Sequence, residues 1–308
     1  MHELYKKYRP DGYGDLVGQA PAVKVLRGLL KKGLPHAMLL TGPSGCGKTT
    51  VARIIKNKLQ CQDSDFVELN SASDRGIDVI RGIDGRMRLG GLLGGPRIWL
   101  FDECHRLTKD AQEAMLKYLE DTPSHVYFLL ATTEPDKLIT AIRTRCTEVR
   151  FAAIGHEDLC KLVNEVAEKE KKQLKESVVL RIAEQAEGSA RKALVLLEQV
   201  IDLRDSKDQI DALMASELKA VAFDIVRALV WQKKKWPDVV KIINGMSPDE
   251  NWEGLRQLIL KCVTDEMLKA NRSPARAFFL LQVFRDPWHY IGRAGLVACS
   301  YEVCQSTK

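Results

Sequence analysis

The chain has 308 residues, of which 45% are hydrophobic and 29% are charged, and its formal net charge is +6. This length exceeds one ordinary hydrophobic core and predicts two or three domains, while the composition excludes a disordered chain. No apolar run approaches the roughly 20 residues that span a bilayer, and the first residues lack the apolar core of a signal peptide. We therefore expect a cytoplasmic protein without a membrane partner, and the sequence leaves a nuclear location open.

The most specific motif of the chain follows its first predicted helix and strand. Residues 1–20 are predicted to form an irregular lead-in, followed by a helix from about Ala20 to Lys32 and a short buried strand, Ala37–Leu40. Gly42 to Thr49 then fit G-x-x-x-x-G-K-[ST], the loop whose backbone N–H groups wrap nucleotide phosphates. Because a helix is predicted from Thr50 to Leu59, the loop precedes a helix N-terminus, where anions are stabilised.

The spacing of this motif follows from phosphate chemistry. Its glycines let the backbone approach the phosphates without a Cβ in the way. Lys48 places a cation against the β- and γ-phosphates, and the Thr49 hydroxyl can hold Mg²⁺. The predicted nucleotide-binding residues of the loop are Gly42, Pro43, Ser44, Gly45, Cys46, Gly47, Lys48, Thr49 and Thr50. The sequence therefore predicts a nucleotide-binding protein.

Two carboxylates follow a later strand. After a strand candidate at Phe66–Leu69, the apolar segment 97–101 ends abruptly in Asp102 and Glu103. In a parallel sheet these side chains lie at the carboxyl edge, beside the phosphate loop, where ligands bind. We expect Asp102 to hold Mg²⁺ directly or through water, and Glu103 to polarise the water that attacks the γ-phosphate.

Two polar residues near these strands allow two interpretations each. Thr133 ends another buried strand, Phe128–Thr133, and either contacts the γ-phosphate or the attacking water, or caps a helix. Gln112 falls within the apolar arc of a helix predicted around 108–119, so its amide needs buried partners. It either caps nearby backbone or connects this helix to another part of the nucleotide site.

The chain is predicted to be helical after Phe151. Ser189 is the expected N-cap of one helix, and Arg191 lies in its first turn, where the helix dipole disfavours a cation. Arg191 either serves an anion from elsewhere or is a tolerated surface residue. From about Ser206 the segments carry apolar spacing without recognisable chemistry, which suggests a small helical bundle.

Taken in order, these segments resemble the clamp-loader ATPases of the AAA+ class, such as the small subunits of replication factor C and the bacterial gamma/tau subunit. The resemblance covers about residues 4–200 well and the remainder only as a helical collar. It is carried by Lys7-Tyr8-Arg9-Pro10, Val17-Gly18-Gln19, the phosphate loop, Asn70 to Asp78, Asp102-Glu103-Cys104-His105, Ala131-Thr132-Thr133-Glu134-Pro135 and Arg143-Thr144-Arg145-Cys146.

The resemblance implies roles that the residues alone do not assign. Arg145 would be the arginine finger that reaches the ATP of a neighbouring subunit, although Thr144 replaces the usual serine before it. Thr133 matches the first sensor position, Arg191 matches the second, and Gln112 matches a glutamine that couples the ATP site to DNA. The family further implies that Tyr8, Arg9 and Val17 bind the nucleotide.

The family also implies that basic side chains hold the duplex backbone without reading its sequence. The candidates are Arg75, Arg81, Arg86 and Arg88. The alternative interpretation is that these arginines lie on a solvated face, where nearby aspartates partly balance their charge. The zinc module of bacterial gamma/tau is missing, because Cys61–Asp65 is too short and has one cysteine. This departure favours a loader of the replication-factor-C or phage type, and we expect no zinc.

We accordingly predict an α/β P-loop AAA+ ATPase domain over 1–152, a helical lid over 153–205 and an all-α oligomerising collar over 206–308. The expected function is an ATPase subunit that binds ATP and Mg²⁺, opens a sliding clamp and loads it on primer-template DNA. It would act with other loader subunits, as a homo- or hetero-pentamer. The alternatives are another AAA+ DNA motor, such as a Holliday-junction branch-migration helicase, and a non-hydrolysing scaffold subunit.

Overall fold

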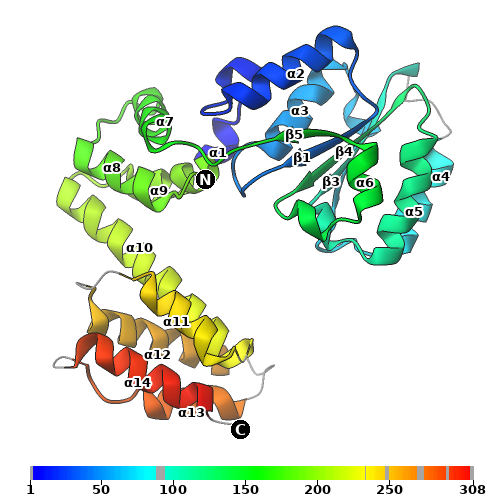
Figure 1. Cartoon of the computed structure of the whole chain (residues 1–308). Helices are drawn as coiled ribbons and strands as arrows, with labels where there is room; N and C mark the ends of the chain where they lie inside the picture. Colours follow the sequence, from blue (N-terminus) through cyan, green and yellow to red (C-terminus); the bar gives the residue numbers. More distant parts are fainter. Residues whose placement is uncertain are drawn as a thin grey trace. The chain divides into compact units, whose positions relative to one another are not determined.

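The computed structural model describes residues 3–87, 94–232, 234–246, 250–268, 274–288 and 291–305. The chain divides into two compact units, Met1–Ser206 and Lys207–Lys308, and only the first contains the sheet (Figure 1). Among these residues, no helix is long and apolar enough to cross a membrane. The predicted fold class is confirmed: an α/β unit is followed by a mostly helical region. The boundary between 1–152 and 153–205 stays a prediction.

Five parallel strands form one sheet in the order β2-β3-β4-β1-β5. Their bounds are β1 Ala37–Thr41, β2 Phe66–Asn70, β3 Arg97–Asp102, β4 Val126–Thr132 and β5 Thr147–Arg150. The pairings of Thr41 with Thr132 and of Phe101 with Leu130 bring the carboxyl ends of β1, β3 and β4 together. Four strands were predicted, and β5 was missed because Val149 is its one aliphatic residue.

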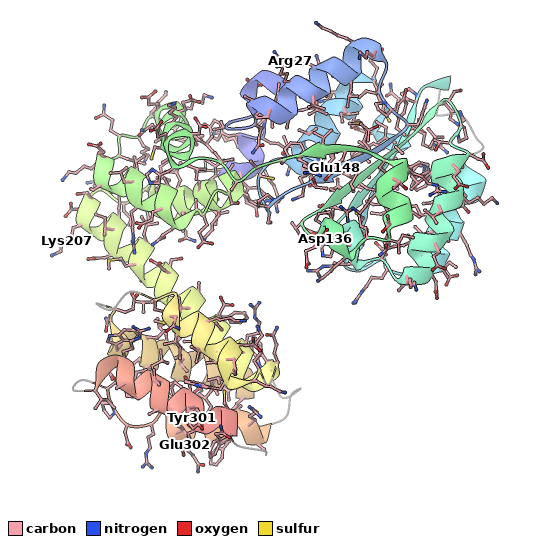
Figure 2. All side chains as sticks on the ribbon, viewed as in Figure 1. Arg27, Asp136, Glu148, Lys207, Tyr301 and Glu302 are labelled. Carbon is pink, nitrogen blue, oxygen red and sulfur yellow. The ribbon has the colours of Figure 1, made fainter. Side chains whose placement is uncertain are left out.

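Helices cover both faces of the sheet. Their bounds are α2 Ala20–Lys32, α3 Lys48–Lys58, α4 Ile77–Met87, α5 Lys109–Glu120 and α6 Thr140–Arg145. Met38 and Leu40 pack with α2 and α3, whereas Leu39 packs with α4, α5 and α6 on the other face. This alternation follows from the two-residue period of a strand. Charged side chains such as Arg27 and Asp136 project outward from these layers (Figure 2).

Three helices follow the sheet in the first unit, α7 His156–Lys169, α8 Glu176–Gln185 and α9 Ala190–Val200. The expectation of an irregular lead-in is wrong, because it contains helix α1, Leu4–Lys7, and a 3₁₀ turn, Tyr13–Asp15. The lead-in is held by the helices after the sheet. Lys7 Nζ lies 2.5 Å from Glu170 Oε1, and the Tyr8 hydroxyl donates to the same oxygen at 2.7 Å.

The second unit is a helical bundle. Its helices are α10 Ser206–Val226, continued by a π-helical turn Arg227–Trp231, α11 Trp236–Asn244, α12 Trp252–Leu268, α13 Pro274–Val283 and α14 Gly292–Gln305. Phe284 and Trp288 are buried among aliphatic side chains of these helices. The buried guanidinium of Arg256 donates to the carbonyls of Phe284 and Arg285 at 3.0 and 2.9 Å. These bonds connect α12 to the segment that follows α13.

Two carboxylates near the edge strand β2 allow a test of buried against exposed ion pairing. Asp65 is 2% exposed and accepts from Arg97 at 2.7 Å, whereas Glu68 forms an exposed pair with Arg53 at 2.5 Å. We expect Asp65→Asn to lower the free energy of unfolding by about 3 kcal/mol, because the desolvated guanidinium loses its carboxylate. We expect the matched Glu68→Gln change to cost less than about 1 kcal/mol. Urea denaturation followed by circular dichroism measures both, and equal losses would contradict the prediction.

Candidate nucleotide-binding site

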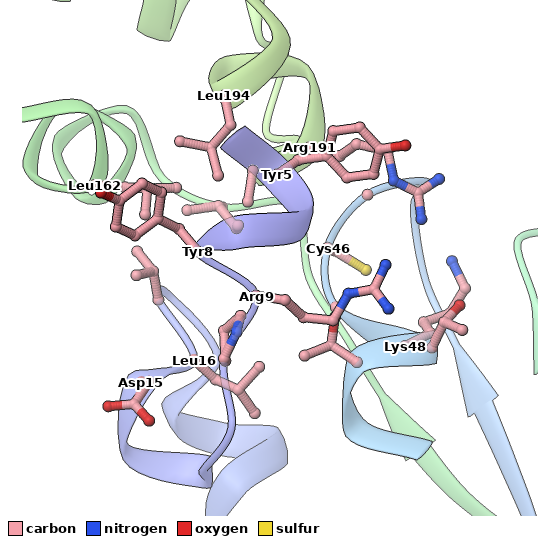
Figure 3. Close-up of a pocket in the computed structure, with 18 of the residues that line it drawn as sticks. Tyr5, Tyr8, Arg9, Asp15, Leu16, Cys46, Lys48, Leu162, Arg191 and Leu194 are labelled. Carbon is pink, nitrogen blue, oxygen red and sulfur yellow. The ribbon is translucent and has the colours of Figure 1, made fainter. Parts of the chain in front are cut away.

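A cavity of about 500 Å³ opens at the carboxyl edge of the sheet. It lies among the lead-in, the phosphate loop, the end of β3 and the helices α7 and α9 (Figure 3). This volume falls within the range of small-molecule sites. The predicted site residues that line it are Tyr8, Arg9, Val17, Ser44, Gly45, Cys46, Gly47, Lys48, Thr49, Thr50, Asp102, Glu103 and Arg191. Residues far apart in the sequence therefore converge on one cavity.

The phosphate loop has the geometry of an anion cradle. Gly42, Gly45 and Gly47 have φ angles of 143°, 73° and 107°, in a region that disfavours residues with a Cβ. Helix α3 begins at Lys48 directly after Gly47, and no side chain in the described part of the chain caps its N-terminus. A ligand or solvent must therefore accept hydrogen bonds from its first N–H groups. The helix dipole favours a negatively charged ligand at this position.

Lys48 supplies the cation of this cradle. The residue is 6% exposed, and its ammonium donates to the carbonyls of Gly42 and Pro43, each at 2.7 Å. Burial lowers the pKa of Lys48 from its ordinary value, since removal from water disfavours the charged form. An ammonium has three protons, so a third is left for a phosphate oxygen. A triphosphate would place negative charge directly against this buried cation.

The oxygens beside the loop fit a magnesium ion. Thr49 Oγ1 donates to Asp102 Oδ2 at 3.3 Å, and the other Asp102 oxygen accepts from the Glu103 N–H at 3.1 Å. Mg²⁺ prefers oxygen ligands, keeps several waters and binds one or two carboxylates together with substrate phosphates. Thr49 and Asp102 are therefore the residues that would hold it.

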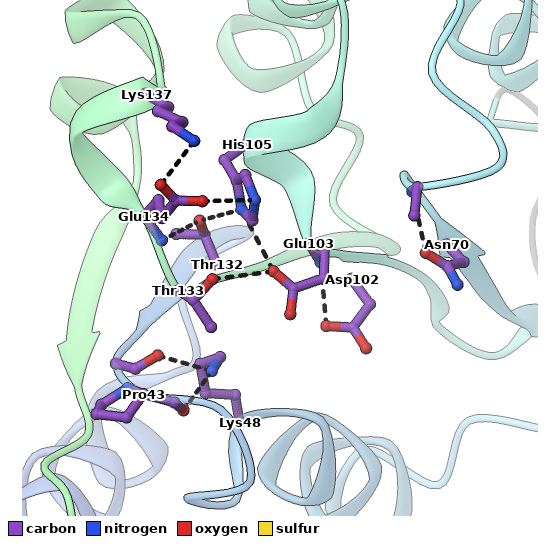
Figure 4. Close-up of polar contacts among 12 residues, drawn as sticks. Pro43, Lys48, Asn70, Asp102, Glu103, His105, Thr132, Thr133, Glu134 and Lys137 are labelled. Atoms are coloured by element: carbon purple, nitrogen blue, oxygen red, sulfur yellow. Dashed lines mark hydrogen bonds and ion pairs between the residues drawn. The ribbon is translucent and has the colours of Figure 1, made fainter. Parts of the chain in front are cut away.

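Glu103 lies just beyond β3 in a strained backbone conformation. Its φ of 52° places a non-glycine residue in the left-handed region, a feature that concentrates at functional sites. The Thr133 hydroxyl donates to Glu103 Oε2 at 3.2 Å (Figure 4). Thr133 itself lies one residue after β4 and is not among the residues that line the cavity. It therefore reaches the site through the Glu103 carboxylate.

Apolar and aromatic side chains also line the cavity. They include Tyr5, Leu16, Ile154, Leu162 and Leu194, none of which was predicted as a site residue. In the sequence, these residues show only apolar periodicity. Residues of the hydrophobic core show the same pattern, so it does not identify a cavity wall. Such a surface suits the flat ring of a nucleobase.

Arg9 and Arg191 contribute positive charge to the cavity. Burial lowers the pKa of Arg9, and the nearby guanidiniums of Arg53 and Arg191 act in the same direction. The Arg191 guanidinium lies 5.9 Å from the centre of the Tyr5 ring, on the lead-in. Arg191 thus faces the cavity and not only the surface. This position favours the interpretation that Arg191 binds an anion over that of a tolerated surface residue.

The phosphate loop contacts the start of α9 closely. Ser189 Oγ caps this helix by accepting from the Lys192 N–H at 3.2 Å. A Cβ added to Gly45 would lie 2.0 Å from that same oxygen. The loop and the helix that carries Arg191 therefore share a contact surface with no room for a methyl group.

Arg145 lies apart from this cavity. Its Nε donates to Glu120 Oε1 at 2.7 Å and its Nη1 donates to the carbonyl of Ala141 at 3.1 Å. It belongs to α6, on the face of the sheet opposite α3, and does not line the cavity of its own chain. A finger that acts on a neighbouring subunit would have such a position, and that role stays a prediction.

Gln112 is 4% exposed and uses both ends of its amide. Its Nε2 donates to the carbonyl of Leu107 at 3.2 Å, and its Oε1 accepts from the N–H of Ile139 at 2.9 Å. Ile139 directly precedes α6, the helix that carries Arg145. The side chain therefore connects the turn after β3 with the start of α6, through backbone partners.

The predicted DNA-binding arginines are only partly described. Arg75 is exposed just before α4, and Arg81 is exposed on that helix, where its Nη1 lies 3.6 Å from Asp78 Oδ1. The side chain of Arg86 and the whole of Arg88 lie outside the described residues. Neither Arg75 nor Arg81 lines the nucleotide cavity.

The sheet, the phosphate loop and the adjoining carboxylates define a P-loop nucleotide-binding protein. A model of the family described as "ATPase family associated with various cellular activities (AAA)" matches residues 38–153. The gamma subunit of DNA polymerase III from Buchnera aphidicola subsp. Schizaphis graminum is 30% identical over 75% of this chain and 71% of that protein. The tau subunit from Bacillus subtilis is 34% identical over 64% of this chain.

The chain belongs to the AAA ATPases and, among them, to the clamp-loader family of the DNA polymerase III gamma and tau subunits. It spans 39% of the length of the Bacillus subtilis tau subunit. Among solved structures, the RuvB Holliday junction branch migration motor of Thermotoga maritima matches with a TM-score of 0.59 and 18% identity. That match covers 86% of this chain and 99% of RuvB, and it concerns the fold alone.

Gly45 offers a test of the contact between the loop and α9. We expect Gly45→Ala to weaken ATP binding by about ten-fold or more, because the added methyl group displaces Ser189 and the φ of 73° strains alanine. Gly33→Ala is the matched control, since Gly33 has a φ of 98° but no neighbour within 4 Å of an added Cβ. Titration with a fluorescent ATP analogue measures both, and unchanged affinity of the Gly45 variant would contradict the prediction.

Proposed function

We propose that the chain is an ATPase subunit of a DNA-replication clamp loader. It would open a sliding clamp, place it on primer-template DNA and release it upon ATP hydrolysis. The observation that supports this proposal best is the convergence of Lys48, Asp102, Glu103 and Arg191 on one cavity in a chain of the gamma and tau family. Assembly with other loader subunits, into a homo- or hetero-pentamer, is part of the same proposal.

Each residue of the cavity has a separate task in ATP hydrolysis. Lys48 Nζ and the N–H groups at the start of α3 would bind the phosphates, and Thr49 and Asp102 would hold Mg²⁺. Magnesium, when bound, withdraws charge from the phosphate oxygens. Glu103 would orient a water molecule and accept its hydrogen bond, while Thr133 fixes the carboxylate through Oε2 at 3.2 Å.

The proposal places DNA and the neighbouring subunit elsewhere on the chain. Arg75 and Arg81 would contact phosphates of the duplex, a contact that weakens steeply with salt. Arg145 would leave Glu120 and complete the cavity of the next subunit, where transition-state charge develops.

The two alternatives have less support. The likeness to RuvB is at 18% identity and carries the fold without the function. A non-hydrolysing scaffold has no need of Glu103, which lines the cavity, has a left-handed backbone and accepts a hydrogen bond from Thr133. Steady-state ATP hydrolysis with clamp and primed DNA, compared with strand unwinding in a helicase assay, tests the proposal against both.

Changes at two residues of the cavity should separate binding from turnover. We expect Lys48→Ala to abolish ATP binding, because the phosphates lose their buried cation. We expect Glu103→Gln to bind ATP normally and to lower turnover by about 100-fold or more, since an amide is a poor proton acceptor. Glu113→Gln, at an exposed position on α5, serves as the matched control. Wild-type turnover by Glu103→Gln would exclude Glu103 as the base.

A change at Arg145 should affect only the assembled loader. We expect Arg145→Ala to leave ATP binding by the isolated chain unchanged and to lower DNA-stimulated hydrolysis of the oligomer by about 1,000-fold. Arg143→Ala removes an exposed arginine of the same helix, paired with Asp136 at 3.2 Å, and should have little effect. Normal turnover by an oligomer built with Arg145→Ala would refute a role in trans.

A further inference from the structure

His105 lies between two carboxylates at the carboxyl edge of the sheet. It belongs to the 3₁₀ turn Cys104–Arg106 that follows β3, and its side chain is 5% exposed. Its Nδ1 lies 3.3 Å from Glu103 Oε2 and 3.0 Å from Thr132 Oγ1, whereas its Nε2 lies 3.2 Å from Glu134 Oε1 (Figure 4). The ring therefore joins the turn after β3 to the turn after β4.

The chemistry of the ring explains why both contacts matter. A neutral imidazole has one N–H and one lone pair, so it donates to one carboxylate while its lone pair is repelled by the other. A ring protonated at both nitrogens donates in both directions. Thr132 Oγ1 adds a fixed partner on the Nδ1 side, because it already accepts from the Glu134 N–H at 3.0 Å. A ring with a proton on each nitrogen is thus held by a carboxylate on each side.

These contacts determine how the Glu103 carboxylate faces the cavity. Both the Thr133 hydroxyl and His105 Nδ1 approach the same oxygen, Oε2, at 3.2 and 3.3 Å. Among the described residues, no contact to Oε1 competes with a water molecule. On the far side, Glu134 is held by Lys137 at 2.7 Å, so the ring has an anchored partner there.

We propose that His105 is a positioning residue for ATP hydrolysis. With a proton on each nitrogen, the ring fixes the Glu103 carboxylate through Nδ1, with Oε1 toward the cavity, and is itself fixed by Glu134 through Nε2. This inference rests on the proposed function, because the orientation of Glu103 matters only if the chain hydrolyses ATP. It assigns His105 and Glu134 to the turnover step and not to nucleotide binding.

Two amide substitutions separate the two sides of the ring. The amide nitrogen of asparagine reaches about as far from the backbone as Nδ1, and that of glutamine about as far as Nε2. His105→Asn therefore keeps a donor for Glu103, His105→Gln keeps one for Glu134, and His105→Ala keeps neither. His36→Asn is the matched control, because His36 contacts the Val126 carbonyl at 2.7 Å, at the amino end of the same sheet.

The experiment measures kcat and KM for ATP with clamp and primed DNA, together with ATP affinity and thermal unfolding of each variant. We expect kcat to fall about ten-fold or more in His105→Ala and His105→Gln, and to stay within about three-fold of wild type in His105→Asn. ATP affinity should be unchanged in all three. Glu134→Ala should lower kcat, and combining it with His105→Ala should add little, because both changes remove the same support.

Three results would overturn the inference. They are equal kcat in all His105 variants, a glutamine variant as active as the asparagine variant, and a loss confined to KM or thermal stability. Wild-type protein that hydrolyses no ATP under these conditions would refute the proposed function itself, and the inference with it. The His36→Asn control shows whether removing any histidine of the sheet is enough to lower kcat.

Discussion

The parallel pairing of β1, β3 and β4 is the constraint on which the site depends. Each strand ends at the same edge of the sheet, so the residue that follows each end reaches the same space. Gly42 follows β1, Glu103 follows β3 and Thr133 follows β4. If the register between two of these strands shifted, the phosphate loop would be separated from Asp102 and Glu103, even though every side chain remained present.

Electrostatics then determine what this space can hold. A buried ammonium, the N-terminus of α3 and two arginines bring positive charge to the cavity. Asp102 and Glu103 line the same cavity, and Asp102 Oδ2 lies 3.3 Å from the Thr49 hydroxyl at the start of α3. A ligand with several negative charges and a divalent cation satisfies both kinds of charge at once, which a neutral ligand does not.

Local patterns predicted the parts of the fold whose signal lies within a short window. The helix at Ala20–Lys32 and four strands follow from apolar periodicity, and the phosphate loop follows from its glycines. Strand β5 and helix α1 were missed because each is four residues long and has a single aliphatic residue, too few to show a period. The contacts of His105 and Arg145 could not be predicted, since they depend on which turns face each other in space.

The contact between Gly45 and Ser189 restricts how the helices α7 to α9 can move. An added Cβ would lie 2.0 Å from the serine oxygen, so the backbone of the loop and the start of α9 are already at their limit of approach. The contact therefore prevents the start of α9 from moving closer to the phosphate loop. The depth of the cavity therefore has a lower bound that is independent of its contents.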